Sequence, residues 1–176
     1  MFVLGIDPSL TESGIIGLRN GSIELSHLIK TKRTGDTPML ELDRLETIVN
    51  EIIFIADKYK PDAIVIEGMA FMARNTTALL QLSGLNYMMR HYLFPKYKTF
   101  IVPPTTLKKF ITGKGNSPKE MMLLEVYKRY KKSFDNNNTC DAFCLAKLGE
   151  ALINKDDPKL TKAQTEVVSL INKQYE

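Results

Sequence analysis

FVLGIDPSLTESGIIGL, residues 2–18, contains two short apolar runs joined by a turn. The first run ends at Asp7, and its shortness and the neighbouring glycine and proline favour a strand buried on both faces over a helix. Residues 15–18 form the second run, so the unit is a hairpin whose first strand carries a carboxylate. An ionised carboxylate beside a buried strand is costly unless a cation compensates it, and a metal ion does so most directly. The alternative that stays open is that Asp7 only caps a turn.

Length and composition allow one proper core. The chain has 176 residues, 44% of them hydrophobic and 25% charged, which predicts a single domain over residues 1–176 with residues 155–176 as a helical C-terminal extension. It contains no run of about 18 uncharged apolar residues and no signal-peptide pattern at its start, so we expect a cytoplasmic protein without a membrane partner. Cys140 and Cys144 lie four residues apart in an expected helix, which favours core residues over a disulfide or a zinc site.

The basic residues are unevenly distributed. The net charge of +4 is only a weak sign of a polyanionic partner. One quarter of the sequence, however, collects lysines and an arginine with few acidic residues among them, namely Lys108, Lys109, Lys114, Lys119, Lys128, Arg129, Lys131 and Lys132. This segment is a candidate phosphate-binding face.

The rest of the chain alternates between short apolar runs and amphipathic helices. Strands are expected near residues 23–29, 63–66 and 98–102, in addition to the two of the hairpin. Helical periodicity covers residues 38–59, 77–93, 105–111, 119–130, 139–153 and 161–172. This order predicts an α/β fold with a five-stranded mixed sheet, three antiparallel strands followed by two parallel ones, flanked by helices.

Carboxylates recur at the ends of these elements. Asp7 and Glu67 both end a buried strand, and a strand, helix, strand crossover places such strands side by side, so the two side chains are expected to converge. Asp141 falls in the first turn expected for the helix 139–153, where the helix dipole alone also favours a carboxylate. Asn138, three residues earlier, shares a helix edge with Asp141, and the two can meet one ion with oxygen donors.

Two connecting segments carry candidate ligand contacts. The segment after Glu67 is unusually apolar, and its Phe71 either tucks under the following helix or stacks on nucleic-acid bases. In TGKGNSPKE, residues 112–120, two glycines flank Lys114 in a turn that we expect to be flexible, with amides and an ammonium close to a phosphate. The spacing of a nucleotide-binding P-loop is absent from this segment, so an ATPase finds no support there.

Four motifs, GIDPSLTESG, IVIEGMAFMARN, TTLKKFITGKGNSPKE and NTCDAFCLAK, strongly resemble the RuvC family of Holliday-junction resolvases in their order and separations. The resemblance covers about residues 2–153. It implies a ribonuclease H-like fold, phosphodiester hydrolysis with two Mg²⁺ ions per active site (Mn²⁺ as a substitute), a homodimer, and branched DNA, four-way junctions above all, as the substrate. Two such sites related by the two-fold axis of a dimer would cut opposed strands of a junction.

The resemblance also implies roles for single residues. Asp7, Glu67 and Asp141 match acidic metal ligands, and Asn138 stands where cellular members mostly carry an acidic residue and phage-encoded relatives more often Asn or His. A phage-type variant acting in the host cytoplasm is thus implied, with a weaker second ion; an inactivating change at Asn138 and a contribution from Asp135 stay open. Lys119 completes the implied catalytic set. The implied DNA contacts are Lys108, Lys109, Lys114, Phe71 and Arg74.

Two further functions compete with junction resolution. One is a broader debranching nuclease with little sequence preference, and the other is a catalytically impaired protein that binds junctions without cutting them. A cleavage assay on a synthetic junction separates the three.

Overall fold

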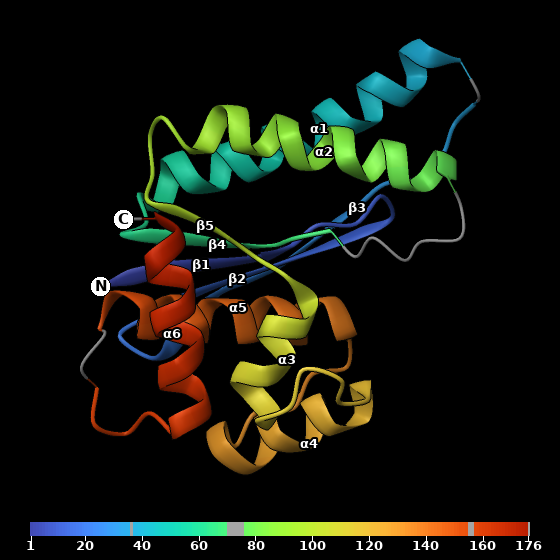
Figure 1. The fold of residues 1–176 in the computed structure, drawn as a ribbon. Coiled ribbons are helices and arrows are strands. Elements are labelled where there is room, and N and C mark those ends of the chain that lie inside the picture. The colour runs from blue at the N-terminus through green and yellow to red at the C-terminus, as the bar shows by residue number, and fades with distance from the viewer. Residues whose placement is uncertain (36, 70–75, 155–156, 176) are drawn as a thin grey trace.

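A five-stranded mixed sheet lies at the centre of the computed structural model, which describes residues 1–35, 37–69, 76–154 and 157–175 (Figure 1). The strands are β1 (Phe2–Asp7), β2 (Glu12–Arg19), β3 (Ser22–Lys30), β4 (Ala63–Glu67) and β5 (Thr99–Val102). Their order across the sheet is β3-β2-β1-β4-β5. The pairs β1–β2 and β2–β3 are antiparallel, whereas β1–β4 and β4–β5 are parallel. The predicted sheet is confirmed.

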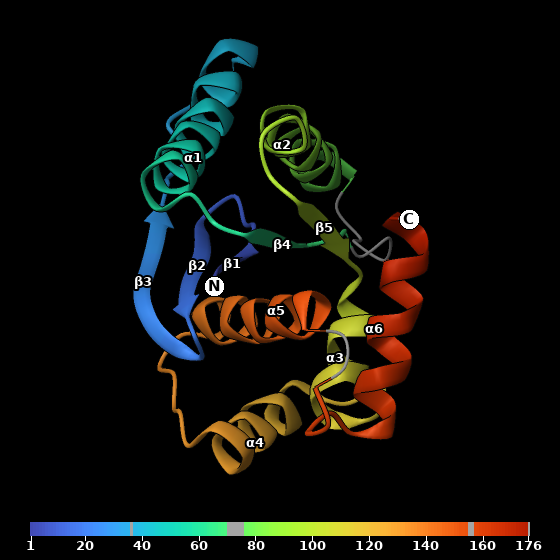
Figure 2. The same cartoon turned by 90° about the vertical axis from the view of Figure 1, so that its left-hand side faces the viewer.

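Helices cover both faces of the sheet. On one face lie α1 (Pro38–Tyr59) and α2 (Thr76–Leu93), and on the other lies α5 (Asn137–Ile153), as the end-on view of Figure 2 shows. Beyond α5 come α3 (Pro104–Thr112) and α4 (Lys119–Tyr130), and α6 (Lys162–Tyr175) stands beside α5 and α3. Each layer has its own apolar cluster, because all six residues of β1 are buried and send alternate side chains to opposite faces.

Helix α5 lies unusually close to the sheet. A Cβ atom on Gly5 would stand 2.0 Å from the Ala142 carbonyl oxygen, and one on Gly14 would stand 2.3 Å from that of Asn138. Only glycine fits at these two strand positions, so the sequence fixes α5 directly over β1 and β2. Since Gly14 pairs with Asp7 in the β1–β2 ladder, the start of α5 lies beside the carboxyl end of β1.

The start of α5 differs from the prediction. The side chain of Asn136 accepts hydrogen bonds from the backbone amides of Asn138 and Thr139, so the helix begins at Asn137 instead of residue 139. Asn138 therefore lies inside the helix, and Asp141 lies beyond its first turn. The interpretation of Asp141 as a simple first-turn residue is wrong, because it was based on a helix start two residues too late.

The last helix reaches across to the edge of the sheet. The hydroxyl of Tyr175 in α6 accepts a hydrogen bond of 2.7 Å from the backbone amide of Ile101 in β5. Its ring meets that of Phe100 edge-on at 5.0 Å. The end of α6 thus covers backbone groups of an edge strand.

Two smaller expectations concern the core and membranes. Cys140 and Cys144 are buried and free, as predicted. In the part of the chain that the structure describes, no helix combines the length and apolar character that crossing a membrane requires.

Candidate active site

Asp7 and Glu67 meet at the carboxyl ends of two neighbouring parallel strands. The register pairs Ile6 with Ile66, so the residues that follow them, Asp7 and Glu67, end β1 and β4 at the same level. Asp7 is 7% exposed, and its burial, together with the nearby carboxylates of Glu67 and Asp141, raises its pKa to about 9. Burial likewise raises the pKa of Glu67 to about 7, although its hydrogen bond with Asp7 opposes the rise. The predicted convergence of the two carboxyl groups is therefore seen.

Asp141 approaches the same place from α5. Burial raises the pKa of its carboxyl group, while the ammonium groups of Lys119 and Lys108 act in the opposite direction. The Nζ atom of Lys119 lies 3.6 Å from Asp141 Oδ2. Two lysines of the basic segment thus face the acidic residues.

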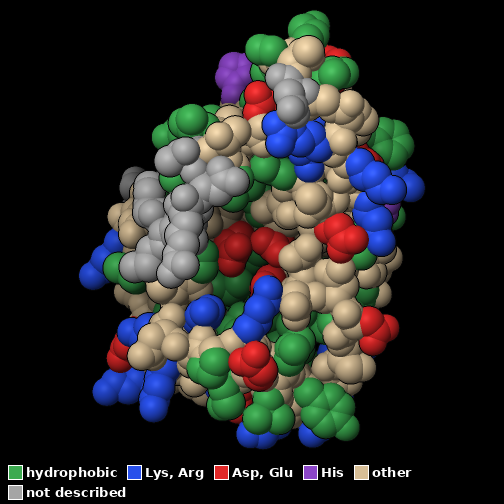
Figure 3. Space-filling model, turned by 90° about the vertical axis from the view of Figure 1, so that its right-hand side faces the viewer, with side chains coloured by type: hydrophobic (Ala, Val, Ile, Leu, Met, Phe, Trp, Pro, Cys, Tyr) green, Lys and Arg blue, Asp and Glu red, His purple; other side chains and the backbone are tan. Residues whose placement is uncertain are grey.

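Figure 3 shows this face of the molecule, where the carboxyl ends of β1 and β4 lie. Acidic side chains form the floor of a hollow, and Lys and Arg side chains stand at its rim. A hollow with a floor of carboxyl groups and a positive rim can hold a cation and, above it, a phosphate. A cavity of about 730 Å³ at the far end of α5, around Lys147, Glu150 and Leu160, contains none of the acidic residues of the hollow.

The donor set fits a hard divalent cation. Carboxylate oxygens are the ligands that Mg²⁺ and Mn²⁺ prefer, and a cation would offset the burial and the carboxylate repulsion that raise the pKa of Asp7. Among the described residues, no three His, Cys, Asp or Glu side chains are gathered closely enough to form a complete metal cage. The acidic residues are instead divided into the pair Asp7 and Glu67 and a third, Asp141, that is bound to Lys119.

The turn after Asp7 is held by hydrogen bonds that do not involve the Asp7 carboxylate. The hydroxyl of Ser13 donates to the Ser9 carbonyl at 2.8 Å and accepts from the Ser9 amide at 3.0 Å. The guanidinium of Arg44 in α1 also donates to the carbonyl of Leu10. Arg44 was not singled out in the sequence, because no local pattern connects a helix residue to a loop more than thirty positions earlier.

The side-chain amide of Asn138 is held against the backbone of β2. Its Nδ2 atom donates to the backbone carbonyl of Glu12 at 2.6 Å, and its own backbone amide donates to Asn136 Oδ1 at 2.8 Å. The carboxylate of Glu12 accepts from Asn136 Nδ2 at 2.9 Å and so ties the start of α5 to β2. Glu12 is a supporting residue that sequence reasoning missed. Asp135, by contrast, is exposed.

The other predicted DNA contacts fall in three groups. The ammonium of Lys109 bonds to Glu166 of α6 at 2.9 Å and so is paired outside the acidic cluster. Lys114 is exposed, and its backbone carbonyl accepts from the hydroxyls of Thr112 at 2.9 Å and Ser117 at 3.0 Å. Phe71 and Arg74 lie outside the described residues.

The sheet order and the helix layers define a ribonuclease H-like fold. The family model described as "Crossover junction endodeoxyribonuclease RuvC" matches residues 3–148. The chain belongs to this family, whose members are metal-dependent.

Relatives from several bacteria resemble the chain over most of its length. It is 28% identical to the RuvC of Thermosipho melanesiensis over 155 residues, 83% of this chain and 97% of that protein. It is 32% identical to a RuvC of Prochlorococcus marinus over 133 residues, 72% of this chain and 81% of that protein. The structure of T. thermophilus RuvC in complex with a Holliday junction substrate superposes with a TM-score of 0.70 at 19% identity, covering 83% of this chain and 90% of that one, and supports the fold.

Proposed function

We propose that this protein is an endonuclease that cuts four-way DNA junctions by hydrolysing phosphodiester bonds. The observation that carries the proposal is the pair of the buried Asp7 and the half-buried Glu67, which faces Asp141 and Lys119 in a hollow with a basic rim. Family membership supports the choice of substrate, because the family is named for endonucleases of crossover junctions. In this proposal residues 1–176 form one nuclease unit, and α6 is a helical extension beyond the matched region.

Asp7, Glu67 and Asp141 would hold Mg²⁺ or Mn²⁺, with two ions per site and the Asn138 amide oxygen as a fourth ligand. When bound, the ions supply Lewis acidity toward the phosphate and the attacking water. Lys119 lies next to Asp141 and would stabilise negative charge that develops on the phosphate oxygens. Lys108 acts on Glu67 and Asp141 from the neighbouring helix and would hold the same phosphate.

Lys109 and Lys114 would bind the DNA backbone at greater distance from the reacting bond. Lys114 is exposed, whereas the ammonium of Lys109 shares its donors with Glu166, which competes with a phosphate for them. Phe71 and Arg74 complete the proposed DNA contacts by sequence resemblance alone. We place the reaction in the cytoplasm, the host cytoplasm if the protein is encoded by a phage.

A homodimer would bring two sites to one junction. Leu80 and Tyr87 of α2 are 73% and 66% exposed, and their spacing of seven residues puts them on one helix face. Large apolar side chains on an exposed helix face are typical of a protein interface. We propose that α2 supplies this interface.

The test is a synthetic four-way junction incubated with the protein and Mg²⁺ or Mn²⁺. We expect symmetric incisions in two opposed strands, lost in Asp7→Asn, which should still bind the junction. Equal cutting of forks and flaps would indicate a broader debranching nuclease instead. Junction binding without incision in either metal would favour the impaired protein that the neutral Asn138 suggests, and would contradict the proposal.

A further inference from the structure

Asn86 is a buried polar residue behind the acidic pair. It lies in α2 and is 1% exposed. Its Nδ2 atom donates to the backbone carbonyl of Glu67 at 3.3 Å. Its Oδ1 atom is buried and has no hydrogen-bond partner among the described residues.

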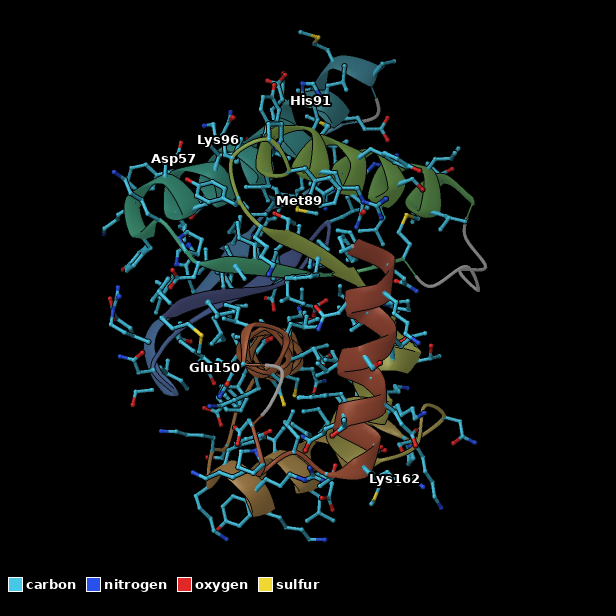
Figure 4. The ribbon with its side chains drawn as sticks, turned by 60° about the vertical axis from the view of Figure 1, so that its left-hand side comes forward. Asp57, Met89, His91, Lys96, Glu150 and Lys162 are labelled. Atoms are coloured by element: carbon cyan, nitrogen blue, oxygen red, sulfur yellow. The ribbon has the colours of Figure 1, made fainter. Side chains whose placement is uncertain are left out.

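Such a residue is unfavourable for folding alone. The neighbouring positions of α2 that face the sheet are apolar, since Leu85 and Met89 are both fully buried in the cluster that contains Ile66. Figure 4 shows Met89 between α2 and the sheet. A leucine at position 86 would continue this apolar face and would remove the unpaired Oδ1 atom, although the Glu67 carbonyl would lose its donor. The asparagine therefore places an unpaired acceptor where the sequence otherwise favours packing, and its bond to the Glu67 carbonyl is what it supplies in return.

The hydrogen bond of Asn86 reaches the residue where β4 loses one of its neighbours. The β1–β4 pairing ends at Ile66, so Glu67 is paired on the β5 side only, opposite Val102. The Gly68 amide then donates to the Val102 carbonyl at 2.7 Å. Asn86 thus supplies a bond to the Glu67 peptide from the helix layer, on a residue that β1 no longer holds.

The amide orientation is fixed by chemistry. The Glu67 carbonyl is an acceptor, so only the NH₂ end of Asn86 can face it favourably. The contact is therefore a directional hydrogen bond. A side chain of similar size without an N–H donor would not replace it.

We propose that Asn86 is a positioning residue that holds the backbone of Glu67, and through it the Glu67 carboxylate, in place for metal binding and phosphodiester cleavage. This inference rests on the proposed nuclease function. Buried groups that orient metal ligands commonly change metal affinity or activity by 10- to 100-fold when they are removed.

The experiment compares Asn86→Leu, Asn86→Asp and the parent protein. Leu removes the donor and the unpaired acceptor, while Asp keeps the shape and loses the amide donor. The control is Asn172→Leu, which changes another buried asparagine, in α6. Four quantities are measured: the melting temperature without metal, the turnover rate and apparent KM on a four-way junction, the Mg²⁺ concentration for half-maximal cutting, and the ¹³C shift of the Glu67 carbonyl.

We expect Asn86→Leu to melt close to the parent temperature, because added apolar burial offsets the lost hydrogen bond, while its turnover rate falls about tenfold and its Mg²⁺ midpoint rises. The KM for the junction should stay the same, and Asn86→Asp should also lose turnover. The Glu67 carbonyl resonance should move in both variants and stay in place in Asn172→Leu. Parent-like turnover and Mg²⁺ midpoint in Asn86→Leu, or an unmoved Glu67 carbonyl, would overturn the positioning role. If the parent itself fails to cut junctions, the proposed function falls, and the carbonyl shift still decides whether Asn86 holds Glu67.

Discussion

The Asp7 carboxyl group makes the metal-free protein sensitive to pH. Its pKa of about 9 in the folded chain lies far above the value of about 3.9 in an unfolded chain. Between these two pKa values the folded state keeps a proton that the unfolded state releases. The contribution of Asp7 to the free energy of unfolding is therefore complete below about pH 4 and is lost as the pH rises toward 9. A bound cation would reverse this dependence, because it favours the ionised carboxylate.

A first prediction follows for Asp7→Asn. The variant keeps a neutral group at all pH values, so without metal it should melt above the parent protein at pH 8, by about 2–4 °C for each kcal/mol gained in a protein of this size. The difference should shrink at pH 5, and junction cutting should be lost at both. Calorimetric melting curves with chelator at the two pH values measure this; equal melting temperatures throughout would mean that Asp7 is not protonated in the folded protein.

Asn138 gives the second prediction at this scale. A neutral amide donates oxygen to Mg²⁺ but does not offset its charge, so the ion it contacts should bind weakly. Asn138→Asp should lower the Mg²⁺ concentration for half-maximal cutting on the order of tenfold. The matched control is Asn137→Asp, which adds the same charge at an exposed neighbouring position. Identical Mg²⁺ titrations for the parent and Asn138→Asp would show that Asn138 is not a ligand.

At the scale of elements, α3 and α4 present Lys108 and Lys119 to the acidic residues carried by β4 and α5. The Lys119 side chain is 50% exposed, so its ion pair with Asp141 adds little to stability. We predict that Lys119→Ala lowers the turnover rate by roughly 10²-fold and Lys108→Ala by less, with melting temperatures close to the parent value. Lys173→Ala, an exposed lysine in α6, serves as the control. Single-turnover cleavage measures the effect, and parent rates in both variants would place the phosphate contacts elsewhere.

The sequence predicts the elements better than the contacts between them. Apolar runs and helical periodicity place each strand and helix to within a few residues, because these patterns are local. The carboxylates of Asp7 and Glu67 are also found this way, since parallel strands must bring their ends together. The bonds from Lys109 to Glu166 and from Asn86 to Glu67 join distant segments, and no local pattern contains them. The roles of these residues in catalysis and DNA binding stay predictions.

At the scale of the whole molecule, the exposed face of α2 predicts how two copies meet. Leu80→Glu together with Tyr87→Glu should convert a dimer into a monomer, because two charges would have to be buried in the interface. The monomer should nick junctions without cutting paired strands. Phe54→Glu changes a side chain of α1 that is 67% exposed and is the control. Light scattering after gel filtration gives the mass, and an unchanged mass for the double variant would place the interface on another surface.

The contact between Tyr175 and β5 has a practical consequence for handling the protein. Unpaired backbone groups on an edge strand are templates for β-pairing with another chain, and the Tyr175 hydroxyl occupies one of them at Ile101. Trimming the end of α6 to obtain a minimal nuclease would uncover this edge. We expect such a truncated protein to precipitate on concentration or storage, and an affinity tag is therefore better placed at the amino end, away from this tyrosine.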